Sequence, residues 1–179
     1  MTIFRKFLMA GAVLGSGIQS QGALDQSAST AAPARVELCD QFDDLQQLAF
    51  PSPKPTVVTI ADRDGGSQIS AWVKPLNDRF GQRISLCGIA ELSSVPPPLR
   101  SWIKQRFQKT QPHPVMMDWT GQAAKAFAYE AGKANIFVLS RQGKILYRTT
   151  GLATQQSLSR LNGVLAAAIA ASTNKITVK

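Results

Sequence analysis

Few side chains in this sequence could do covalent chemistry: it holds two cysteines and one histidine. Cys39 and Cys87 are too far apart to form a Cys-x-x-Cys redox pair. In an oxidising compartment an even cysteine count predicts a disulfide between them. The alternative is two separate thiols, with Cys87 a small buried hydrophobe inside a strand. His113 stands between two prolines and is expected on a polar surface, and one imidazole excludes metal sites that need several.

Acidic residues near the ends of predicted strands form the second candidate group. Asp62, Asp64 and Glu91 could converge there as an acidic patch or a weak cation site, although solvated loop carboxylates are the favoured interpretation. Asp118 is expected to cap the helix that starts near Thr120. The sequence has neither a Walker A loop nor a Gly-x-Gly-x-x-Gly run, so nucleotide binding has no support. We therefore expect no cofactor and no resident metal.

Five runs of β-branched and apolar residues have the length of buried strands. They cover residues 56–61, 84–90, 114–117, 135–140 and 144–149. The last two flank Arg141-Gln142-Gly143, a strong hairpin signal. Residues 36–48 alternate loosely and predict an edge strand with a turn.

Helical spacing of apolar residues appears in four further segments. These are residues 67–80, 98–109, 121–131 and 154–171. Pro75 predicts a kink or a break in the first of them. In the second, the shared face expected against the core consists of Leu99, Trp102, Ile103 and Phe107. Strands that alternate with helices predict an α/β fold with one mixed sheet covered by helices on both faces.

This order of elements, with its Gly-turned hairpin and C-terminal helix, resembles the thioredoxin-like fold. The segment "HPVMMDWTGQAAKAFAYEAG" and the hairpin "NIFVLSRQGKIL" make it more similar to the redoxin and peroxiredoxin-like branch. The resemblance covers roughly residues 36–170. It implies a thioredoxin-like domain over residues 35–172, followed by a tail at 173–179.

The resemblance also implies where redox chemistry would be located, and that chemistry is missing. The Cys-x-x-Cys position corresponds to Asp64, Gly65, Gly66 and Ser67, which cannot exchange disulfides. The family's proline, normally cis, falls at about Ala134, and its buried carboxylate falls at about Val58. The turn is therefore interpreted as a degenerate site with no catalytic residue, in which Ser67 or Asp64 caps the following helix.

The N-terminus has the layout of a secretory signal. Arg5 and Lys6 precede an apolar run too short to span a bilayer, and small residues follow it. We expect a cleaved signal at 1–22, a flexible linker at 23–34, and export, most simply to a periplasm. No cysteine lies near the run, so a lipobox is absent.

Composition and charge complete the functional expectations. The formal net charge is +9, which favours anionic partners, and no nucleic-acid recognition motif is present. The basic helix at Arg100–Lys109 is a candidate surface for an acidic protein or a membrane. We therefore expect a non-enzymatic exported protein that acts by binding a protein or a ligand. The alternative is an atypical thiol-dependent, peroxidase-like enzyme that uses Cys87 with Cys39. The oligomeric state stays open.

Overall fold

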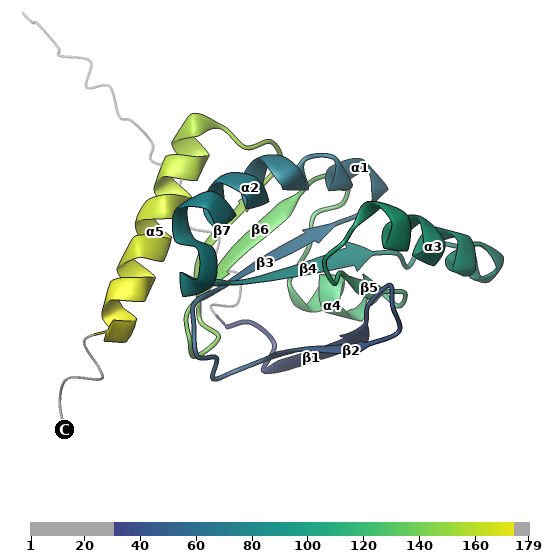
Figure 1. The fold of residues 1–179 in the computed structure, drawn as a ribbon, viewed down its shortest axis with the longest axis horizontal. Helices are drawn as coiled ribbons and strands as arrows, with labels where there is room; N and C mark the ends of the chain where they lie inside the picture. Colours follow the sequence, from purple (N-terminus) through teal and green to yellow (C-terminus); the bar gives the residue numbers. More distant parts are fainter. Residues whose placement is uncertain (1–30, 174–179) are drawn as a thin grey trace, which may run out of the picture.

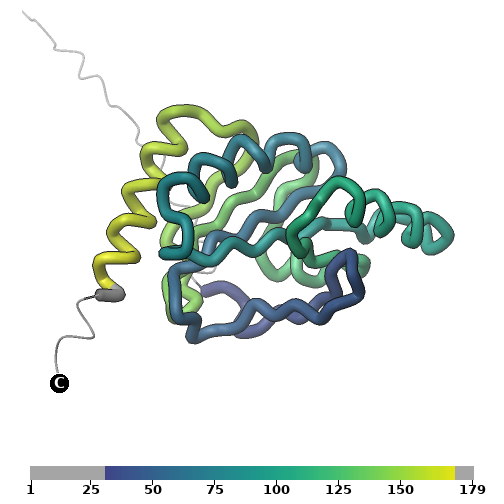
Figure 2. Tube along the Cα trace, viewed as in Figure 1, coloured from purple at the N-terminus to yellow at the C-terminus, as the bar shows by residue number. Residues whose placement is uncertain are grey.

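The structure, a computed structural model, describes residues 31–173 (Figures 1 and 2). The expected signal at 1–22, most of the linker and nearly all of the tail lie outside these residues. Ala31 forms a β-bridge with Lys144, and the Ala32 N–H donates to the Gly143 carbonyl at 2.9 Å. Ala31 and Ala32, which precede the expected domain start at Arg35, thus already pair with the 143–144 segment. Within the described range, no helix combines the length and apolar character needed to cross a bilayer.

A five-stranded mixed sheet forms the centre of the molecule, in the order β5-β4-β3-β6-β7. Its strands are β3 (Thr56–Ala61), β4 (Ser85–Glu91), β5 (Met116–Asp118), β6 (Asn135–Leu139) and β7 (Ile145–Thr150). The first three run parallel, whereas β6 is antiparallel to both β3 and β7. All five predicted runs are thus strands of one sheet, and the predicted hairpin is confirmed.

One face of the sheet packs against helices α2 (Ile69–Phe80) and α5 (Gln155–Thr173), as Figure 1 shows. The shared core contains β-strand and helix residues that are almost fully buried: Val57, Ile136, Val138, Trp72, Leu76, Leu161 and Leu165. These helical residues repeat every three or four positions, as an amphipathic helix requires. Helix α3 (Arg100–Thr110) lies at the β5 end of the sheet, next to a smaller core around Ala90, Leu92 and Met117.

The opposite face is covered by helix α4 (Gln122–Ala126) and by a hairpin of β1 (Arg35–Cys39) and β2 (Leu45–Ala49). Helices therefore cover both faces, as expected for this α/β fold. The hairpin is a separate two-stranded sheet, so the expectation of one edge strand at 36–48 was wrong. An isolated bridge from Asp40 to Met116 joins the hairpin to the main sheet.

Two helices differ from the sequence expectation. A short helix α1 (Arg63–Gly66) precedes α2, which runs unbroken through Pro75 because Trp72 and Leu76 on its inner face are fully buried. Helix α4 ends at Ala126 instead of continuing to 131. Ala128 then adopts a left-handed conformation with φ of 49°, which ends the helix and turns the chain towards β6.

Gln41 connects the β1–β2 hairpin to the loop after α3. Its fully buried side chain donates to the carbonyls of Gln111 (3.0 Å) and His113 (2.8 Å) and accepts from the Val115 N–H (2.9 Å). Its own carbonyl accepts from the side chain of Gln108 at 2.6 Å. The amide therefore satisfies three peptide groups that would otherwise lack partners.

We predict that Gln41→Ala lowers the free energy of unfolding by about 3 kcal/mol, because partly buried peptide groups lose their partners. Gln47→Ala is the matched control, since Gln47 is exposed on β2 and bonds only the exposed Glu37. That control should change stability by about 0.5 kcal/mol or less. Urea unfolding of both variants measures the difference, and equal losses would contradict the assignment.

Candidate functional site

The turn after β3 is organised by the Asp62 carboxylate. One oxygen accepts from the N–H groups of Asp64 (3.0 Å) and Gly65 (2.8 Å), so Asp62 is the N-cap of α1. The other accepts from the Gly132 N–H at 2.6 Å, in the loop before β6. The prediction that Ser67 or Asp64 caps the helix was wrong, because Asp62 occupies that position and α2 starts without a side-chain cap.

The protonation of Asp62 follows from these contacts. Partial burial acts to raise its pKa, but hydrogen bonds from Gly65, Gly132 and Asp64 and the nearby hydroxyl of Tyr129 lower the pKa overall. A carboxyl group with a depressed folded-state pKa stabilises the fold above its unfolded pKa. That contribution is lost as the pH falls through the folded value. At neutral pH the anion therefore links the turn to the β6 loop.

Gly65 brings the turn into direct contact with the same loop. A Cβ atom at this position would lie 2.3 Å from both the carbonyl carbon and the carbonyl oxygen of Lys133, and 2.8 Å from the Ala134 nitrogen. Those atoms belong to the backbone, so they cannot move aside as a flexible side chain could. The adjacent Ala134 N–H donates to the Gln68 side chain at 3.2 Å. Only glycine fits at position 65 without a shift of the backbone.

The loop itself is held by the buried side chain of Asn135. Its amide oxygen accepts from the Glu130 N–H at 2.9 Å, and its amide nitrogen donates to the carbonyls of Glu130 (2.8 Å) and Lys133 (3.0 Å). Together with Asp62 and Gln68, this amide uses several of the polar backbone groups of the loop. Side-chain hydrogen bonds from Asp62, Gln68 and Asn135 therefore join the turn and the loop into one unit.

Two positions expected to replace family features lie in this region. Ala134 is fully buried, and its peptide bond is not cis, since the cis peptide within residues 31–173 is Phe50–Pro51. Its N–H, which a proline would lack, bonds Gln68. Val58 is fully buried in the apolar core beneath α4 and the hairpin. No carboxylate stands there.

The two cysteines lie away from the turn and are free thiols in the structure. Cys87 pairs with Val58 in the middle of the sheet, and its sulfur lies 3.7 Å from the Met116 sulfur. Burial raises the pKa of Cys87 to about 12. Cys39 is exposed on β1, whose alternate residues Val36 and Leu38 face the core that Cys87 contacts. A disulfide between them would require β1 to rearrange, so the pairing stays a prediction.

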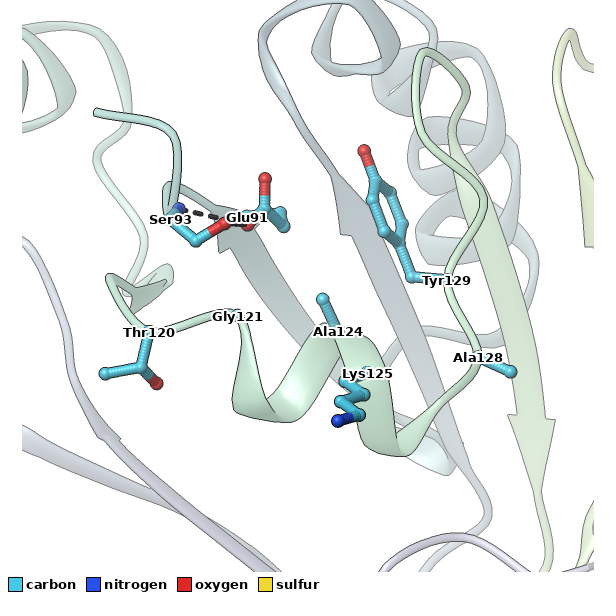
Figure 3. Close-up of a pocket in the computed structure, with 8 residues that line it drawn as sticks. All are labelled: Glu91, Ser93, Thr120, Gly121, Ala124, Lys125, Ala128 and Tyr129. Atoms are coloured by element: carbon cyan, nitrogen blue, oxygen red, sulfur yellow. Dashed lines mark hydrogen bonds between the residues drawn. The ribbon is translucent and has the colours of Figure 1, made fainter. Parts of the chain in front are cut away.

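An open pocket of about 510 Å³ lies between the end of β4, helix α4 and Tyr129 (Figure 3). It is lined by Glu91, Ser93, Thr120, Gly121, Ala124, Lys125, Ala128 and Tyr129. Glu91 accepts from the Ser93 hydroxyl and from the Ser93 N–H at 3.0 Å. The pocket offers hydrogen-bonding groups and a carboxylate, but no thiol, so it can hold a polar molecule and cannot exchange disulfides.

Tyr129 connects the pocket to the turn, and sequence reasoning missed it. Its hydroxyl oxygen is buried without a hydrogen bond of normal geometry to any described residue, although Asp62 is close enough to interact with it. Burial, followed by the interaction with Asp62 and the charge of Glu91, raises the pKa of Tyr129, so the hydroxyl keeps its proton at neutral pH. The sequence placed Tyr129 inside a helix, which hid this position.

The remaining candidate residues are either structural or exposed in loops. Asp118 is fully buried and accepts from the Ala124 N–H at 2.9 Å in the first turn of α4, which confirms its capping function. His113 is exposed in a loop, as expected. Asp64 is exposed, whereas Asp62 is more than a solvated loop acid because it binds two segments. Residues 31–173 contain no cluster of three or more potential metal ligands, so the idea of a cation site gains no support.

Comparisons with known proteins give the fold. No protein-family model matches the sequence, and neither does any curated protein. The chain is similar in structure to a putative thiol:disulfide interchange protein DsbE from Chlorobium tepidum, with 16% identity, 78% of this chain and 95% of that chain covered, and a TM-score of 0.59. It also resembles the thioredoxin domain of a thiol-disulfide oxidoreductase from Bacteroides vulgatus, with 14% identity, 79% and 99% coverage, and a TM-score of 0.56.

A third similar structure is peroxidoxin BcpB from Mycobacterium tuberculosis, with 18% identity, 79% of this chain and 97% of that chain covered, and a TM-score of 0.52. By their names, two of these structures are thiol-disulfide proteins and the third is a peroxidoxin. At these identities the similarity concerns architecture, because residues that do chemistry differ freely on a shared fold. The chain has a thioredoxin-like fold.

Two neighbouring glycines test the geometry of the turn. We predict that Gly65→Ala lowers the free energy of unfolding by about 2–3 kcal/mol, since the new Cβ meets the Lys133 backbone. Gly66→Ala should be neutral or stabilising by about 0.5 kcal/mol, because nothing lies within 4 Å of a Cβ there. Thermal and urea unfolding of both variants provide the measurement. If the two alanines had the same effect, the contact between turn and loop would be wrong.

Proposed function

We propose that this protein is an exported, non-enzymatic member of the thioredoxin-like fold that acts by binding. The single observation behind this proposal is that the turn after β3 holds no thiol and is hydrogen-bonded to the loop before β6. Where the fold's thiol chemistry would lie, Asp62 and Gly65 join the turn directly to the loop before β6. On this proposal the turn has a structural role, and the protein binds its partner through other surfaces.

Export is supported by the N-terminal sequence. Two cations, an apolar run and small residues follow one another in the order of a cleavable signal. On this proposal the mature chain begins near residue 23 and folds in a periplasm.

The alternative function, thiol chemistry at Cys87 with Cys39, finds little support in the geometry. A thiol with a pKa of about 12 is ionised to roughly one part in 10⁵ at pH 7, whereas the thiolate is the nucleophile. Cys87 also lies within β4, several residues before its carboxyl end. The turn, by contrast, starts at Asp62, beyond the carboxyl end of the neighbouring strand β3. The two thiols lack the exposed position at a helix start that activates cysteines.

The test is a thiol-activity assay on the purified mature chain. We expect no catalysed reduction of insulin disulfides by dithiothreitol and no catalysed consumption of hydrogen peroxide, because the accessible turn has no sulfur. The Cys39→Ser and Cys87→Ser variants should match the wild type in both assays. A thioredoxin with an intact Cys-x-x-Cys serves as the positive control.

Turnover by the wild type that disappears in Cys87→Ser, with the fold retained by circular dichroism, would reject the proposal in favour of the thiol enzyme. Turnover that disappears only in Cys39→Ser would reject it as well, since it would place the reactive thiol on β1.

A further inference from the structure

Helix α3 presents a row of exposed side chains that the sequence pattern had assigned partly to the core. Leu99, immediately before the helix, is 51% exposed, and Trp102 is 58% exposed. Arg106 and Lys109 follow and are also exposed. Spacings of three, four and three residues place these four side chains on one side of the helix. We call them the α3 stripe.

The expectation that Leu99 and Trp102 face the core is therefore wrong, and the physical reason lies in the other side of α3. Ile103 and Phe107 pack against the small core around Met117. The Arg100 guanidinium lies over the Trp119 ring at 5.3 Å, and Lys104 forms an ion pair with Asp43 at 2.6 Å. These contacts fix the rotation of the helix, so the α3 stripe faces solvent.

The α3 stripe combines apolar and cationic groups without compensating acids. Between residues 92 and 117 the sequence has no aspartate or glutamate. The Arg106 guanidinium lies 5.9 Å from the centre of the Trp102 ring, so the indole and a cation are neighbours on the surface of the helix. Neither Arg106 nor Lys109 forms an ion pair with a carboxylate in the described part of the chain. The stripe is thus complementary to a negatively charged surface with an apolar layer beneath it.

Shape and residue composition together favour a lipid surface among the anionic partners. Figures 1 and 2 show α3 at one end of the molecule, extending past the sheet, so the stripe lies on a protruding helix. The pocket near Tyr129 includes no α3 residue. An amphipathic helix can dock into a groove of a partner protein, but an apolar and cationic stripe on a convex helix also matches a lipid surface, which adapts to its shape. Tryptophan and leucine beside lysine and arginine are the residues that settle at a membrane–water interface.

We propose that the α3 stripe docks this protein onto the surface of an anionic lipid bilayer. Leu99 and Trp102 enter the headgroup layer, and Arg106 and Lys109 lie against lipid phosphates. The attachment is peripheral and salt-sensitive, because two apolar side chains and two cations give a weak, reversible contact. It is independent of the turn and of any thiol.

The experiment uses the mature chain and sedimentation with vesicles of pure phosphatidylcholine or of phosphatidylcholine mixed with anionic phosphatidylglycerol. We expect binding to the anionic vesicles, loss at high salt, and a blue shift in tryptophan emission. Arg106→Gln/Lys109→Gln should weaken binding roughly 25-fold, at about fivefold for each cation. Trp102→Phe should abolish most of the emission shift.

The matched control is Lys74→Gln/Lys125→Gln, which removes the same charge from exposed positions on α2 and α4. It should bind nearly as well as the wild type. Equal losses in the two double variants would overturn the proposal, because binding would then depend on net charge alone. Folded wild type that ignores anionic vesicles would overturn it too. If that protein instead bound polyglutamate through Arg106 and Lys109, the stripe would be a site for acidic protein.

Discussion

The Asp62 carboxylate is the contact on which this structure depends most. It joins two segments that are 70 residues apart in the chain, the turn after β3 and the loop before β6. The carboxylate satisfies two N–H groups that the start of α1 leaves without partners, and it also accepts from the Gly132 N–H across the junction. Because the junction is fixed, Gly65 can lie against the Lys133 backbone and Tyr129 can sit above the pocket.

The positions expected to correspond to the redox parts make contacts that support one another. A side chain at position 65, between the two positions where the family has cysteines, would push the β6 loop away, so close contact between turn and loop requires glycine there. Ala134 supplies an N–H where the family has a proline, and Gln68 accepts it. Val58, at the position expected for the family's buried carboxylate, packs in the apolar core. The thioredoxin-like sheet stays intact because its stability comes from packed strands and helices, which need no thiol.

The sheet could be predicted because strand periodicity and the Arg141–Gly143 turn act locally. The site could not, because its partners are distant in sequence. Nothing near Asp62 indicates that it binds Gly132, and Tyr129 looks like a helical residue until Ala128 turns the chain. Trp102 shows the same limit of sequence-based prediction. Its spacing fits a core-facing helix side, but Ile103 and Phe107 on the other side of α3 pack against the core, so Trp102 is exposed to solvent.

The most direct test of this account is an NMR titration of the Asp62 carboxyl carbon in the mature protein, with Asp62→Asn for assignment. Two changes are predicted: a midpoint below the usual value of 3.8, and a shift of the Gly132 amide proton with the same midpoint. The shared midpoint would arise because one carboxylate accepts from that amide. A midpoint at or above 3.8, with a Gly132 amide that does not respond, would show that the turn and the loop are not joined by Asp62.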